Sequence, residues 1–256
     1  TTFIRKKHFE IHTALVFNES KGILDIAPSG IVMENGDFEL EGSIDTKNDM
    51  DLDLAIKGTK PNFDMLIAFA PVDVIPVLEK YKNAGEIYFN ATIKGPANKG
   101  NRPAINAEFG AGKAFLENTA RAKKIDNMGF RGHFTNGVNR DASTMEFSLT
   151  DMTASLEKGE FKGALLVKNF ESPEVDMQLD ANFNLDFITD FFELQQVQKA
   201  SGNIALQMNF HDIVDIDDPK KALQQLNQAY YAALKVENLH LEAKELPVPL
   251  DSLNVN

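Results

Sequence analysis

Alternation of apolar and polar residues constrains the fold of this chain more than any other feature of its sequence. The pattern is clearest between residues 144 and 212. A period of two places successive apolar side chains on one face of a strand, so that this face can be buried while the other meets water. The alternating runs are Met145–Leu149, Leu165–Val167, Val175–Phe183 and Ile204–Phe210. They predict strands that each have one apolar face.

The same order of features occurs twice along the chain. Positions that recur with an offset of 122 or 123 residues are Glu34/Glu157, Gly36/Gly159, Phe38/Phe161 and Asp64/Asp186. Gly85, which opens a strand pattern, is matched by Gly202 at a slightly smaller offset. Because the glycines, a helical segment and the order of elements all match, we predict a tandem duplication of a unit of roughly 120 residues. The predicted division is leading strands in 1–20, a first unit in 21–143 and a second unit in 144–256.

Three segments have the spacing of short helices: 64–82, 186–199 and 219–234. The third begins with Asp218 as a good N-cap and Pro219 at the first helical position, and it has no counterpart in the first unit. The predicted fold is therefore mostly β, of the α+β type. We expect an extended, twisted antiparallel sheet, built from the two units, with a few short helices packed on it.

Composition excludes several classes of function. The net charge of −12 disfavours nucleic acid as a partner, because binding phosphates requires clustered Lys and Arg. The absence of cysteine excludes thiolate catalysis, disulfides and thiolate metal sites. No apolar run is long enough to span a membrane, and the first ten residues are not followed by the apolar core of a signal peptide. We expect the chain to be a piece of a longer protein.

No residue pattern predicts catalysis, a metal or a cofactor. His8 and His12 have the spacing of a metal-ligand pair on a helix, but their neighbours alternate as in a strand and no third ligand is near. The acidic run 211–218 lacks the Asp-x-Asp-x-Asp-Gly order and the distal Glu of a calcium loop. Residues 110–113 lack the spacing of a phosphate-binding loop. We predict that the chain is not an enzyme.

The apolar rows are the remaining feature, and they allow two interpretations. In one, the rows form an ordinary core that the helices close completely. In the other, part of the apolar face stays open as a groove for acyl chains. The residues that we predict to line such a groove are Phe89, Ile93, Phe147, Leu149, Met177, Leu179, Leu206 and Met208.

Several short strings resemble the AsmA-like family of bacterial envelope proteins, in its Bacteroidetes form. They occupy residues 85–95 (GEIYFNATIKG), 134–137 (FTNG), 156–159 (LEKG), 169–173 (NFESP) and 215–218 (DIDD). The resemblance implies an inner-membrane anchor elsewhere in the parent protein, a long periplasmic β-repeat body and a role in the lipid homeostasis of the outer membrane. It supplies no catalytic residues.

We therefore expect a non-enzymatic periplasmic segment that binds or conducts phospholipid or another acyl-chain lipid. Its other expected partners are neighbouring repeats of the same parent chain, which could pair with exposed edge strands, and further envelope proteins. The alternative is a structural or assembly module of the cell envelope with a closed core and no lipid. A hydrolase with paired carboxylates in a polar cleft is a more distant alternative.

Overall fold

The computed structural model describes residues 7–69, 75–213, 230–244 and 248–256. Nearly all regular structure in them is strand. The strands are β1 (Phe9–His12), β2 (Leu15–Asn18), β3 (Ile23–Met33), β4 (Gly36–Asp45), β5 (Asp51–Lys60), β6 (Lys82–Pro96), β7 (Ala104–Asn118), β8 (Lys123–Thr135), β9 (Glu146–Leu156), β10 (Gly159–Lys168), β11 (Glu174–Asn184), β12 (Val197–Ile213), β13 (Tyr230–Ala243) and β14 (Leu250–Val255). The helices are α1 (Asp64–Ile67), α2 (Ile75–Glu79), α3 (Leu185–Phe191) and the 3-10 turn η1 (Ala142–Thr144).

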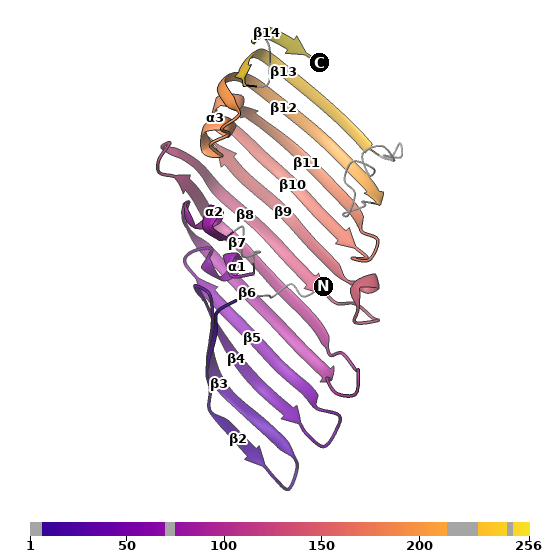
Figure 1. Cartoon of the computed structure of the whole chain (residues 1–256). Helices are drawn as coiled ribbons and strands as arrows, with labels where there is room; N and C mark the ends of the chain where they lie inside the picture. The colour runs from indigo at the N-terminus through magenta and orange to yellow at the C-terminus, as the bar shows by residue number, and fades with distance from the viewer. Residues whose placement is uncertain (1–6, 70–74, 214–229, 245–247) are drawn as a thin grey trace.

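The fourteen described strands form one twisted sheet in which, from β2 onward, neighbours in sequence are neighbours in space. From β3 to β14 each strand pairs antiparallel with the next, and β1 and β2 both pair with β3. In Figure 1, α1, α2 and α3 lie close to one end of the strands. The predicted mostly β fold with an extended, twisted antiparallel sheet and a few short helices is confirmed.

Strand register gives the sheet an apolar face and a polar face. Paired residues point to the same side of a sheet, so a row of partners can be followed across it. One such row runs Leu149↔Leu165↔Met177↔Phe210. The neighbouring row on the opposite face runs Ser148↔Leu166↔Asp176↔His211 and is mainly polar. The alternation in the sequence therefore sorts side chains onto two faces, as the period of two requires.

The two halves of the sheet contain the same order of elements. β3, β4 and β5 precede α1, as β9, β10 and β11 precede α3, and three strands follow in each half. The turn before β4 and the turn before β10 each contain a glutamate with positive φ, Glu34 at 53° and Glu157 at 52°. Gly85 and Gly202 both lie where a strand bulges against its next neighbour. These matched positions support our prediction of a tandem duplication.

The helices are shorter than the sequence predicts. The predicted helical region 64–82 is divided into α1 and α2, as Pro71 within it leads us to expect, but residue 82 already belongs to β6. The predicted helix 186–199 ends at Phe191, because from Val197 onward β12 pairs with β13. A ladder of backbone hydrogen bonds to a long neighbouring strand outweighs the weak local preference for helix.

The third predicted helix, 219–234, is wrong at its end. Tyr230, Ala233 and Leu234 are strand residues of β13, paired with β12 through Phe210↔Tyr230 and Leu206↔Leu234. Residues 214–229, which hold the rest of this prediction, lie outside the described part of the chain.

Candidate functional site

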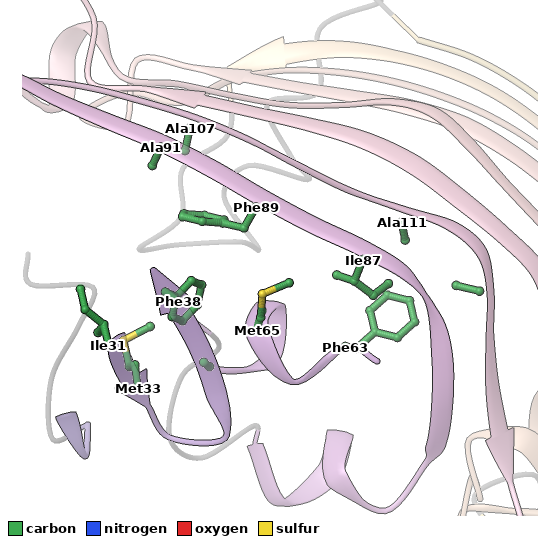
Figure 2. Packing of buried hydrophobic residues seen from close by; sticks show 12 residues of the cluster. Ile31, Met33, Phe38, Phe63, Met65, Ile87, Phe89, Ala91, Ala107 and Ala111 are labelled. Carbon is green, nitrogen blue, oxygen red and sulfur yellow. The ribbon is translucent and has the colours of Figure 1, made fainter. Parts of the chain in front are cut away.

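The first hydrophobic cluster lies under α1, on the apolar face of β3–β7. Met65 of α1 has no exposed surface and lies among Phe38, Phe63 and Ile87 (Figure 2). Small residues on the next strands, Ala91, Ala107 and Ala111 among them, complete this cluster. The ring of Phe89 stacks on Phe69 with 5.0 Å between centroids. This part of the apolar face is therefore a closed core.

A second cluster lies under α3, where the two halves meet. Phe187 and Phe191 of α3 are fully buried against Ile125 of β8 and Leu156 of β9. Tyr81 stacks on Phe191 at 5.0 Å and its hydroxyl donates a hydrogen bond to the Phe191 carbonyl at 3.2 Å. The helix is thereby fastened to the first half of the sheet.

Asn118, at the end of β7, completes this junction. Its amide Nδ2 donates to the Phe191 carbonyl at 2.9 Å and to Glu193 Oε1 at 2.8 Å, and only 4% of the residue is exposed. Last-turn carbonyls of a helix have no partner within the helix, so a side-chain donor that binds one of them stabilises its end.

Beyond these two clusters many side chains of the apolar face are half-buried. We call this region the open band. The name refers to the following half-buried apolar-face residues, which belong to neither cluster: Ile44, Leu52, Leu54, Ile93, Ile105, Phe147, Leu149, Leu165, Val167, Val175, Met177, Leu179, Leu206, Met208 and Phe210. The helices α1 and α3, of four and seven residues, contribute their buried side chains to the two clusters.

Strand register makes the open band continuous across the second half of the sheet. One row joins Phe147, Val167 and Val175, and the next joins Leu149, Leu165, Met177 and Phe210. A third joins Leu179 to Met208. With neighbouring strands about 4.8 Å apart, the row from β9 to β12 is about 14 Å long. In the first half, Leu54, Ile93 and Ile105 form a corresponding row.

Seven of the eight residues predicted to line a groove lie in the open band, and one does not. Phe89 is only 8% exposed and belongs to the cluster under α1. Of the residues that the prediction omitted, Leu165, Val167 and Phe210 lie directly beside predicted ones. The same alternation identifies them, but their neighbours across the sheet become known only when the register is known.

Two hollows lie beside strands of the sheet. One, of about 500 Å³, is lined by Arg121, Asp186, Asp190, Glu193 and Lys199 among others. The hydrogen bond from Asn118, with Lys80 nearby, lowers the pKa of the Glu193 carboxyl. This favours the ionised carboxylate, which accepts the hydrogen bond from Asn118 at the end of α3. A general acid of a glycosidase needs the opposite shift. The other hollow, of about 560 Å³, has Leu179 and Met208 of the open band in its lining, together with polar residues that include Gln178, Asp180 and Gln207.

No metal site or membrane span is found in the described ranges. The two histidines with metal-like spacing lie on or beside the edge strand β1, each close to Glu10: His8 at 3.5 Å and His12 at 3.6 Å. Among the residues that the structure describes, no group of three or more His, Asp and Glu side chains could hold a metal ion. None of the described helices is long and apolar enough to cross a membrane.

No protein-family model, curated protein or solved structure matches this chain. The function must therefore be argued from the chemistry of the open band.

Proposed function

We propose that the chain binds or conducts acyl-chain lipid along the open band, as a periplasmic segment of an AsmA-like envelope protein. The observation that carries the proposal is the band itself, a continuous set of half-exposed Leu, Val, Ile, Met and Phe side chains on one face of the sheet. Water in contact with such a surface is unfavourable, and contiguous exposed apolar area commonly marks a binding surface.

An acyl chain fits this surface better than a polar ligand does. Each methylene group that leaves water contributes about 0.8 kcal/mol and requires no hydrogen-bond partner. The side chains of Met177 and Met208 are flexible and polarisable, so they adapt to a ligand that has no fixed shape. The band offers no charged side chain, which leaves the lipid headgroup to project beyond the band into water.

Native mass spectrometry of the purified chain, combined with extraction and analysis of copurifying lipid, tests the proposal. We expect bound phospholipid that is lost on delipidation and restored when lipid is added back. Met177→Asp should abolish this binding, whereas Gln178→Asp, the adjacent residue on the polar face, should leave it unchanged. A folded protein that never carries lipid would instead favour the closed structural module.

A further inference from the structure

The outer edge of β14 presents unpaired backbone groups and apolar side chains. Among the described strands, β14 pairs only with β13, and nothing pairs with its other side. Leu250, Leu253 and Val255 are 38%, 41% and 42% exposed. An exposed edge of this kind is a template for another strand.

The position of β14 in its half of the sheet identifies the kind of strand that fits. β13 and β14 pair through Leu241↔Leu250, Leu239↔Leu253 and Val236↔Val255. β7 and β8 pair through Leu116↔Ile125, Ala114↔Met128 and Ala111↔Phe130. Every residue of one set lies 125 positions after its counterpart, and the register shifts fall at the same places.

Backbone conformation supports the same equivalence. Lys113 and Asn127 have positive φ, at 49° and 50°, and so do Asn238 and Ser252, at 53° and 56°. These pairs also differ by 125. Non-glycine residues seldom adopt this conformation, so two coincident pairs mark β13–β14 as a second copy of β7–β8.

In the first half, the edge that corresponds to the free edge of β14 is occupied. β8 pairs there with β9 through Ile125↔Leu156, Asp126↔Ser155 and Gly129↔Thr153, and Ile125 is only 9% exposed. The same pairing of a strand with its neighbour is found at the N-terminal edge of the sheet, where β3 corresponds to β9. β1 and β2 lie along β3 with Phe9↔Met33 and Phe17↔Leu24, as β8 lies along β9 with Ile125↔Leu156 and Phe134↔Phe147.

We infer that the free edge of β14 binds the first strand of a further repeating unit, a strand of the β3 or β9 type, antiparallel and in the β8–β9 register. Such a strand would place its last apolar residue beside Leu250, as Leu156 lies beside Ile125. A second copy of this chain offers no free strand of that type, because its β3 and β9 already have partners on both edges. The inference does not rest on lipid binding.

One contact of the existing junction is not repeated at the new edge. Ala243 occupies the position that corresponds to Asn118, so the donor that binds the helix end at Phe191 has no counterpart there. Docking at β14 must therefore depend on the strand ladder and on burial of Leu250, Leu253 and Val255.

Disulfide trapping with a peptide of residues 145–157, which contains β9, tests the inference on the full chain. The chain has no cysteine, so every disulfide reports an introduced pair. Asp251→Cys should trap a peptide carrying Ser155→Cys, because Asp126 and Ser155 are partners in the β8–β9 register. A peptide carrying Thr150→Cys, five residues along the strand and so about 17 Å away, should be trapped at least about tenfold less.

Two controls make the result specific. Asn254→Cys with a Thr153→Cys peptide repeats the test in the same register without altering the contact between His240 and Asp251. Asp126→Cys should trap neither peptide, because β9 already covers that position. Equal trapping of in-register and out-of-register peptides, no trapping by both β14 variants, or predominant disulfide-linked dimers of the chain would each overturn the inference.

Discussion

The stability of a Met177→Asp variant tests whether the band is open or closed. Met65→Asp is the matched variant for comparison, because Met65 lies in a closed core. Met65 belongs to α1, has no exposed surface and lies in the same cluster as Phe38, Phe63 and Phe89. Truncation of a buried Met costs about 2–5 kcal/mol, and an unpaired buried carboxylate adds several more. Most small domains are stable by about 5–15 kcal/mol, so Met65→Asp should unfold the protein or come close to doing so.

Met177 is half-buried in the open band, and a carboxylate there can reach water. The loss is then only the partial burial of the Met side chain, about 1–2 kcal/mol. For a protein of this size that loss lowers the unfolding temperature by about 2–8 °C. Lipid binding should nevertheless disappear, because an acyl chain laid across the band would have to desolvate the charge.

Thermal unfolding followed by circular dichroism, together with native mass spectrometry, measures both effects. Gln178→Asp is the control, since its side chain is exposed on the polar face and a change there should alter stability by no more than about 0.5 kcal/mol. If Met177→Asp unfolds the protein as Met65→Asp does, the band is closed. If Met177→Asp stays folded and still copurifies with lipid, lipid does not bind at the band.

Three further predictions concern the framework of the sheet. Asn118→Ala removes the donor to the Phe191 carbonyl and Glu193 and should cost about 1–3 kcal/mol in denaturant unfolding; a cost near zero would show that the junction does not need it. Gly85→Val places a Cβ 2.4 Å from that of Ala114 and should cost about 1–3 kcal/mol, whereas Gly30→Ala, with nothing within 4 Å, should cost less than about 1 kcal/mol; equal costs would contradict the argument. His240 bonds Asp251 of β14 and Glu242 of its own strand, with Lys199 of β12 nearby, and these carboxylates raise its pKa above 6.5. The stability that its charge contributes is therefore present at pH 6.5 and below, and is lost as pH rises through the raised pKa. It is also lost in acid, as Asp251, whose pKa is lowered below 3.8, becomes protonated. The difference in unfolding temperature between wild type and His240→Gln should follow this window, and a pH-independent difference would refute it.

Strands could be predicted from the sequence because their alternation is long and regular. The apolar rows of β11 and β12 are those that the pattern predicts, but the pairing of Leu179 with Met208 becomes known only from the register. The end of the third predicted helix could not be predicted in this way. Tyr230, Ala233 and Leu234 fit a helical spacing, while Tyr230, Ala232 and Leu234 fit a strand equally well. The choice is made by β12, a strand of seventeen residues that offers backbone partners along its whole length.

The turn between β3 and β4 could be predicted only in part from the sequence. An Asn-Gly pair such as Asn35–Gly36 is a strong hairpin signal, and a hairpin is present there, but the residue with positive φ is Glu34, and Gly36 is the first residue of β4. At Gly36 a Cβ would lie 3.1 Å from the backbone of Met65, so close packing of α1 is a reason for glycine there. The sequence alone indicates a turn at this position and gives no sign of the helix above it.

Whether the apolar face is open or closed depends on helix length, which periodicity predicts poorly. Among the described residues, the segments predicted as helices of nineteen and fourteen residues contain the four residues of α1, the five of α2 and six of the seven residues of α3. Longer helices would have covered more of the rows that now form the open band. Because α1 and α3 lie at one end of the strands, the apolar positions of Ile93, Leu149 and Met177 remain outside both clusters (Figure 1). The same alternation of residues is compatible with a closed core and with a lipid-binding surface. The difference depends on how much of the apolar face the short helices cover.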